Sequence, residues 1–490
     1  MNPEIPGYYF DEEKKKYFKI QKNHSTPVGS AYSADAVKKR KAEDQARLVA
    51  EERAFRVKNH IKRHPIGRDL VEGGLLARET ALGRVAESGR GQYEDEDIVA
   101  AAWARGAVSK GVVPFLPMRA WTRLPNLPCF YVGGEDTETS MATAYAFLDR
   151  DILMASHVPT DANDQISFSR HARGATRPPE GFQKEMIRCQ QVSSIKYHAP
   201  SGHILLTSGM PDESCGLWLF APYSSDYDPR GSDVEEYWVP GLTDRWRKLN
   251  FRHNRREEQW FVHSTTPAPE SSDLICVVGT NSGIVEMHSN ETMQWTAPKT
   301  PPKGSSQTPQ EIFSQDFQQG NHNVVYAGGR ASRLWTADLR GPDTQWSHIR
   351  HVSSIAHLRS VNPHQVLVSG LRSSMALYDT RFVKQAANGS RPLLLFPEHR
   401  NEAHFHIGWD VNTRLGVVAA AQDNGTVRLF SLRSGRRIAS SSVDALASDT
   451  PFKSLGFTQL QYERLPSLFV GVGPTLRKFS FGVEDVDDEA

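Results

Sequence analysis

The sequence predicts an all-β fold, a ring of seven four-stranded sheets called a β-propeller, preceded by an α-helical N-terminal extension. Two observations support this prediction. After residue 111, an apolar run, a small polar turn and an alternating run recur, and the later copies begin about 40 to 52 residues apart, the period of a propeller blade with variable loops. Shorter segments precede most copies by roughly 8 to 14 residues and would supply a further strand.

The repeated units share one order of apolar run, polar turn and alternating run. They begin at Cys129, Ile204, Ile275, Val324, Val366 and Val417, with a truncated copy at Leu468. The preceding segments are SSIKY at Ser193, QDF at Gln315, SSIAH at Ser353 and KSLGF at Lys453. The first two intervals, about 70 to 75 residues long, require insertions. Seven such units would close a ring without a free sheet edge.

Composition excludes several classes of protein. The 490 residues carry a formal net charge of +1, so the whole chain has no strong bias toward nucleic acid or anionic membranes. Its four cysteines form no Cys-x-x-Cys pair, which argues against structural zinc and a disulfide framework. No secretory signal and no apolar stretch of about 18 residues is found. We therefore expect a soluble intracellular protein, nuclear, cytoplasmic or both, with no membrane partner.

The chain is expected to have three parts: an N-terminal arm over 1–110, the propeller over 111–482 and an acidic tail over 483–490. Within the arm, residues 33–64 contain no Gly or Pro and are rich in helix-forming residues, which predicts one long helix. A second helix is predicted over 75–85 because Leu75, Leu82 and Val85 fall on one face.

One stretch of the repeats, VLVSGLRSSMALYDTRF from Val366, shows what a blade requires. It predicts a strand, a turn and a returning strand that ends on Tyr378. The tyrosine would fill the gap between blades, and Asp379 would accept hydrogen bonds in the next turn. The pattern leaves open whether Arg381 is solvated or binds a partner.

These repeats resemble WD repeats, with Tyr378-Asp379 in place of the family's Trp-Asp and with Ala337-Asp338 and Phe430-Ser431 at equivalent positions. The family usually carries an Asp in the upstream turn, where this chain has Gly370 and Gly329.

Two adjacent copies end as Asp-x-Arg, at Asp338-Leu339-Arg340 and at Asp379-Thr380-Arg381. This pair resembles the box by which substrate receptors of cullin-4 ubiquitin ligases contact their adaptor, the large damaged-DNA-binding protein. The opening IPGYYFDEEKKKYFKI looks like the N-terminal signature of the cullin-4-associated factor 4 type, and LLARETALGR from Leu75 is similar to the short helix that docks on the adaptor.

The resemblance implies a non-catalytic substrate receptor that links target proteins to a cullin-4 RING ubiquitin ligase. Its expected partners are the adaptor with the cullin-4 complex and a protein substrate that the sequence does not name; no cofactor is expected. The expected adaptor contacts are Asp338, Arg340, Asp379 and Arg381, with Leu75, Leu76 and Leu82 in an apolar groove.

The sequence also bears on two other classes of protein. The run Lys38-Lys39-Arg40-Lys41 would suit a WD-repeat scaffold of a nuclear RNA- or chromatin-associated complex, or equally a solvated helix face. Phosphate-binding loops, dinucleotide-binding motifs and nucleophile elbows are missing, so an enzyme is not expected. His404 and His406 lack a third ligand at useful spacing, so no metal site is predicted.

Overall fold

The structure is a computed structural model. It describes residues 8–11, 15–19, 37–39, 41–42, 47, 97–115, 126–136, 141–148, 152–160, 164–166, 183–188, 191–208, 216–221, 247–250, 261–296, 311–340, 346–381, 385–386, 389–460 and 463–482. The chain divides into two compact units, residues 1–66 and 67–490.

The N-terminal unit contains an antiparallel hairpin of β1 (Tyr8–Asp11) and β2 (Lys16–Lys19). Lys15, just before β2, has a positive φ of 49°. Of the predicted long helix, residues 37–39 and 41–42 are described and are helical. Residue 47 is also described and helical. Three segments lie outside the described residues: the rest of that helix, the predicted helix over 75–85 and the acidic tail over 483–490.

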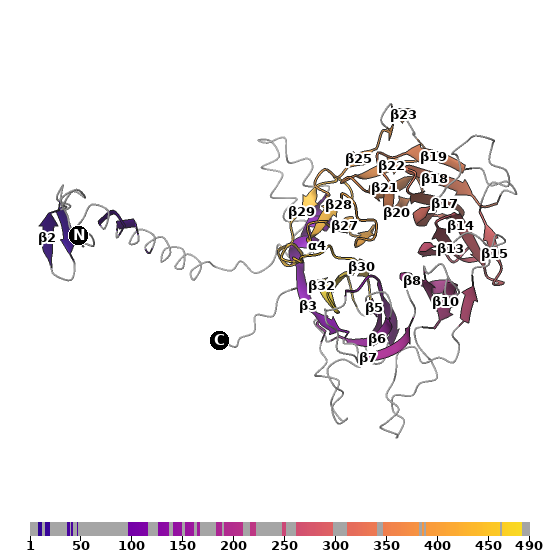
Figure 1. Cartoon of the computed structure of the whole chain (residues 1–490), viewed down its shortest axis with the longest axis horizontal. Coiled ribbons are helices and arrows are strands. Elements are labelled where there is room, and N and C mark those ends of the chain that lie inside the picture. The colour runs from indigo at the N-terminus through magenta and orange to yellow at the C-terminus, as the bar shows by residue number, and fades with distance from the viewer. Residues whose placement is uncertain are drawn as a thin grey trace, which may run out of the picture. The chain divides into compact units, whose positions relative to one another are not determined.

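The second unit is a seven-bladed β-propeller, which confirms the predicted architecture (Figure 1). Each blade is a four-stranded antiparallel sheet, and the blades are numbered in chain order. In blades 1 to 4 the four strands follow one another along the chain. Blades 1 to 4 consist of β4 (Phe130–Asp136), β5 (Met141–Leu148), β6 (Ile152–Pro159) and β7 (Gln183–Arg188); β8 (Val192–His198), β9 (His203–Ser208), β10 (Gly216–Phe220) and β11 (Arg247–Asn250); β12 (Val262–Pro267), β13 (Leu274–Thr280), β14 (Gly283–His288) and β15 (Met293–Trp295); and β16 (Ile312–Gln318), β17 (Asn321–Gly329), β18 (Arg333–Asp338) and β19 (Trp346–Arg350).

Blades 5 and 6 follow the same plan, whereas blade 7 takes its outer strand from the start of the unit. They consist of β20 (Ile355–Asn362), β21 (Gln365–Gly370), β22 (Met375–Asp379) and β25 (Leu394–Leu395); β26 (Trp409–Asn412), β27 (Val417–Ala421), β28 (Val427–Ser431) and β29 (Arg437–Ile438); and β30 (Leu455–Thr458), β31 (Ser467–Val472), β32 (Thr475–Phe481) and β3 (Ala107–Pro114). The remaining described elements are α4 (Ile98–Gly106), η5 (Ala199–Ser201), α5 (Ser441–Asp444) and a small hairpin of β23 (Gln385–Ala386) and β24 (Gly389–Ser390).

The predicted repeats correspond to real strands. From Ile204 onward, each predicted apolar run is the second strand of its blade, and the shorter segments are the innermost strands β8, β16, β20 and β30. The first copy differs, because the run after Cys129 is the innermost strand β4 and the alternating run is the second strand β5. The long early intervals arise inside the blades, where 160–182 link β6 to β7 and 221–246 link β10 to β11.

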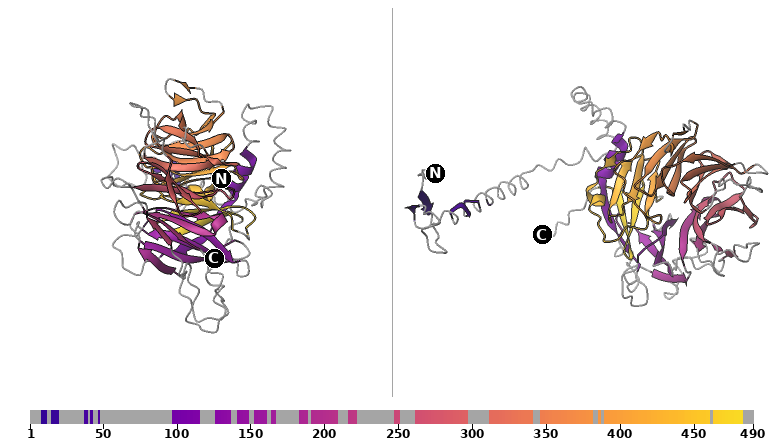
Figure 2. Two further views of the ribbon diagram at one scale, coloured as in Figure 1. Left: turned by 90° about the vertical axis from the view of Figure 1, so that its right-hand side faces the viewer. Right: turned by 45° about the horizontal axis from the view of Figure 1, so that its top comes forward.

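Ring closure is the point at which the structure departs from the predicted domain boundary. The boundary between residues 110 and 111 falls inside β3, which pairs antiparallel with β32 from Ala107↔Phe481 to Pro114↔Thr475. Figure 2 shows this early strand beside the last strands of the chain. The helix α4 immediately before it also packs on the propeller, so the folded unit begins ahead of the sequence-based boundary.

The helix α4 is fixed to the propeller chiefly by one side chain. Trp103 is fully buried, its ring lies edge-on to that of Phe457 with centroids 5.5 Å apart, and its indole N–H donates to the Pro466 carbonyl at 3.1 Å. An apolar side chain that size contributes much of the packing energy of a short helix, and its one polar atom is satisfied.

Replacing Trp103 with alanine should therefore lower the free energy of unfolding by roughly 3 to 5 kcal/mol. Val99 on the same helix is 48% exposed and gives a matched control, since Val99→Ala removes little buried surface. Denaturant unfolding of the full chain, followed by circular dichroism rather than by tryptophan fluorescence, measures the unfolding free energy of both variants. Equal unfolding free energies in the two variants would show that α4 is not part of the folded propeller.

Candidate functional site

The two predicted Asp-x-Arg motifs lie at equivalent strand ends of neighbouring blades. Asp338 is the last residue of β18, the third strand of blade 4, and Asp379 is the last residue of β22, the third strand of blade 5. Because third strands of a propeller run in the same direction, both motifs lie at the same end of the ring. The structure thus brings the predicted residues of the two repeats to one face.

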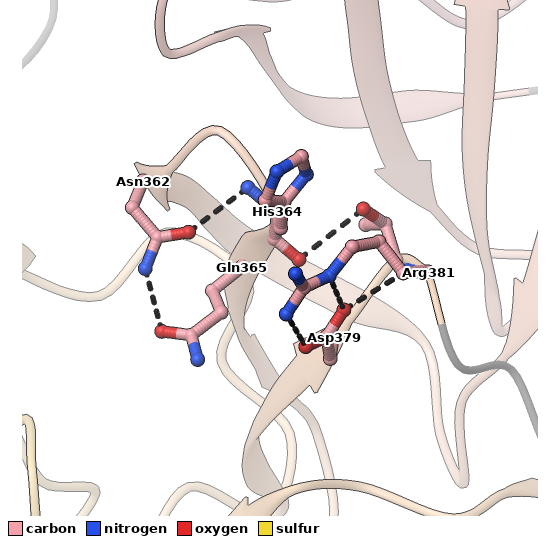
Figure 3. A network of polar contacts seen from close by, with 6 residues as sticks. Asn362, His364, Gln365, Asp379 and Arg381 are labelled. Atoms are coloured by element: carbon pink, nitrogen blue, oxygen red, sulfur yellow. Dashed lines mark hydrogen bonds and ion pairs between the residues drawn. The ribbon is translucent and has the colours of Figure 1, made fainter.

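Each motif folds back on itself. Figure 3 shows Arg381 beside Asp379: its backbone N–H donates to Oδ1 at 3.0 Å, its Nε to the same oxygen at 3.1 Å, and its Nη2 to Oδ2 at 2.8 Å. Arg340 makes the same three bonds to Asp338, at 3.1, 2.9 and 2.5 Å. The side-chain hydrogen bond from each arginine is the main cause that lowers the pKa of its aspartate to about 2. Both pairs are therefore ionised at neutral pH.

Both arginines remain accessible. The Arg340 side chain is 65% exposed and that of Arg381 is 52% exposed. An exposed ion pair contributes little to stability, because water screens it. Its larger effect is geometric, since a two-point contact holds a long side chain in one rotamer. The sequence predicted that Asp379 would accept hydrogen bonds in the next turn; it did not predict that the acid would also orient the arginine.

The third copy of the motif is completed from a distant part of the chain. Ser431 stands where blades 4 and 5 have aspartate, and its Oγ accepts the backbone N–H groups of Arg433 and Ser434 at 3.1 Å each. The carboxylate comes from Asp97, immediately before α4, which accepts hydrogen bonds from the hydroxyls of Ser431 and, at 2.5 Å, Ser434. No local sequence signal links residues more than 330 positions apart.

Below the Asp379 motif, a buried polar network ties Tyr378 to the opposite end of its blade. Nδ1 of His351 lies 2.8 Å from the Tyr378 hydroxyl and its Nε2 lies 2.9 Å from Ser374 Oγ, which in turn lies 2.6 Å from Ser353 Oγ. A Cβ at Gly370 would lie 2.5 Å from the Ser353 oxygen and 2.6 Å from that of Ser374. Glycine therefore stands at this turn because the network occupies the space that a larger side chain would need.

Other predicted site residues are only partly described. Leu75, Leu76 and Leu82 lie outside the described residues; of the basic run, Lys38, Lys39 and Lys41 are described and helical. Within the described part of the chain, no group of three or more His, Cys, Asp or Glu side chains is placed to hold a metal ion. None of the described helices has both the length and the apolar character needed to cross a membrane.

Comparison with known proteins adds no relative, because no protein-family model and no curated protein matches the sequence. The fold therefore carries the classification. A seven-bladed propeller fits a WD-repeat protein-interaction scaffold, and this architecture is typical of non-catalytic scaffold and receptor proteins.

Buried neutral histidines should make the propeller sensitive to acid. Burial lowers the pKa of His351 to about 4 and that of His399 to about 4. In the unfolded chain these histidines bind protons near pH 6.5. The stability that the fold gains by keeping them neutral is therefore complete above that pH and is lost as the pH falls toward 4. Each such histidine should remove roughly 2 kcal/mol of unfolding free energy between pH 7 and pH 5.

Urea unfolding at the two pH values would measure this loss. His351→Gln should reduce the difference between pH 7 and pH 5, whereas His364→Gln, at an exposed turn position, should not. A pH difference in His351→Gln as large as that of the unmodified chain would contradict the assignment of His351 as a buried neutral group.

Proposed function

We propose that this chain is a substrate-recognition subunit of a cullin-4 RING ubiquitin ligase. It would bind the large damaged-DNA-binding-protein adaptor through the strand ends that carry Arg340 and Arg381. The observation that supports this best is the repetition of one exposed, internally braced Asp-x-Arg arrangement in two adjacent blades. A structural role alone does not require two arginines to be held outward in the same way.

The braced geometry suits recognition of a protein partner. A guanidinium has five N–H donors, and its pairing with one carboxylate does not exhaust them. Because the intramolecular bonds already fix each rotamer, less side-chain entropy is lost when a partner carbonyl or carboxylate docks. The aspartates keep the local charge balanced, so the surface attracts hydrogen-bond acceptors without creating a large basic patch.

The N-terminal arm completes the proposal. Leu75, Leu76 and Leu82 would enter an apolar groove of the adaptor as one face of a helix. The chain would contribute proximity, holding a substrate near a ubiquitin-loaded enzyme bound elsewhere in the complex. A nuclear, cytoplasmic or dual location is compatible with this role.

The double variant Arg340→Ala with Arg381→Ala tests the proposed contact. If both guanidinium groups become buried on binding, their removal should cost roughly 2 to 5 kcal/mol, or about a thirtyfold or greater loss of affinity for the purified adaptor. Calorimetry or surface plasmon resonance would measure the affinity, and the melting temperature should stay unchanged because both arginine side chains are exposed.

Arg330→Ala is the matched control. Arg330 is also an exposed arginine paired with a carboxylate, that of Glu311, but it lies before the start of β18 and so at the other end of the blade. Its loss should leave adaptor affinity unchanged. Full affinity in the double variant would remove the residue-level support for the proposed function.

A further inference from the structure

The innermost strands of the blades surround a central channel. Their side chains line a cavity of about 530 Å³ with residues from all seven inner strands. This volume falls in the range of pockets that hold drug-sized ligands. It has room for a few residues of an extended peptide, but not for a helix or a folded domain.

Charged side chains meet at one level of this channel. Lys196, Asp316 and Arg359 are each the fifth residue of their inner strands β8, β16 and β20. The same irregularity at the start of all three strands keeps their registers equivalent. Asp410 of β26 joins the group, its Oδ1 lying 2.7 Å from Nη2 of Arg359.

The acceptors of this cluster are already satisfied by the protein. Asp410 accepts the Arg359 bond and, through Oδ2, the backbone N–H of Phe457 at 2.8 Å. Asp316 accepts the backbone N–H groups of Ser360 at 2.9 Å and Phe317 at 3.0 Å. Neither carboxylate therefore needs a cationic ligand.

The donors, in contrast, are in excess. Nζ of Lys196 makes no hydrogen bond or ion pair with any described residue, and within the same part of the chain Nε of Arg359 has no hydrogen-bond partner. Lys196 is exposed to the channel, but the inner strands around it partly remove it from bulk water; this desolvation, followed by the charge of Arg359, lowers its pKa. Three lysine or arginine side chains line the cavity, those of Lys196, Arg359 and Lys453, whereas only two carboxylates do, those of Asp316 and Asp410. An anionic oxygen ligand would supply the acceptor that this cluster lacks.

One wall of the channel is aromatic. Phe405, from the segment between β25 and β26, stacks on Phe313 near the start of β16, with ring centroids 5.0 Å apart. His263 packs edge-on to Phe313 at 5.0 Å, and all three line the cavity. Aromatic surfaces beside a charged centre suit a ligand that combines apolar atoms with an anionic group, and a bare inorganic ion could use only the centre.

We propose that the central channel binds a carboxylate carried by a short acidic peptide segment of a partner protein, with Lys196 and Arg359 as its donors. That the ligand is a protein segment rests on the proposed role as a substrate receptor; that it is anionic rests on the channel alone.

Calorimetry on the full chain would test this with triglutamate, its neutral counterpart triglutamine and inorganic phosphate as probes. Triglutamate should bind roughly tenfold or more tightly than triglutamine, because only it offers charged acceptors. Lys196→Met should abolish that preference. Lys248→Met should keep it, since Lys248 makes the same change of charge on β11, the outermost strand of the same blade.

A measurement on the unmodified chain avoids dependence on the folding of Lys196→Met. Mass spectrometry after brief reductive methylation should show that triglutamate slows modification of Lys196 but not of Lys248. Equal binding of both peptides, or no protection of Lys196, would overturn the proposal. Phosphate binding as tightly as triglutamate would overturn the assignment to a peptide. Because none of these measurements uses the adaptor, their failure would leave the adaptor contact untouched, and adaptor affinity should be the same in Lys196→Met.

Discussion

The pairing of β3 with β32 is the interaction on which the rest of the structure depends. It joins residues 107–114 to residues 475–481 and so completes blade 7. Among the described blades, this is the one built from both ends of the propeller unit. The buried ion pair of Lys478 and Glu463, at 2.5 Å, lies in the same blade, and Nζ of Lys478 also donates to the Asp164 carbonyl at 2.8 Å. Closure thereby links blade 7 to the segment that follows β6 and removes the free edges of an open ring.

A closed ring turns repeated sequence into repeated geometry. Equivalent strands end at equivalent places, so Arg340 and Arg381 face the same side although 41 positions separate them in the sequence. The same regularity sets Lys196, Asp316 and Arg359 at one level of the channel. One frame thus carries both binding regions that we propose: the strand ends for the ligase adaptor and the channel for an acidic segment.

Much of this frame could be predicted from local pattern. Apolar runs and turns identified the second strands and most inner strands, because burial on both faces of a sheet leaves a strong signal in sequence. Long-range partnerships could not be predicted in this way. The strand β3 resembles no repeated unit, and Asp97 replaces the missing acid beside Ser431 from more than 330 positions away. Local pattern does not single out Lys196 and Arg359, because a charged residue in a strand usually faces solvent. Only closure of the ring places these two side chains in a central channel.

Hydrogen–deuterium exchange of the chain with and without the purified adaptor would test the central claim most directly. Docking on the Asp-x-Arg surface predicts slower exchange at the ends of β18 and β22 and in the turns that follow them, with the opposite ends of the same blades, around Arg330 and Ser373, unchanged. Protection confined to those opposite ends, or no protection of the propeller at all, would contradict the account.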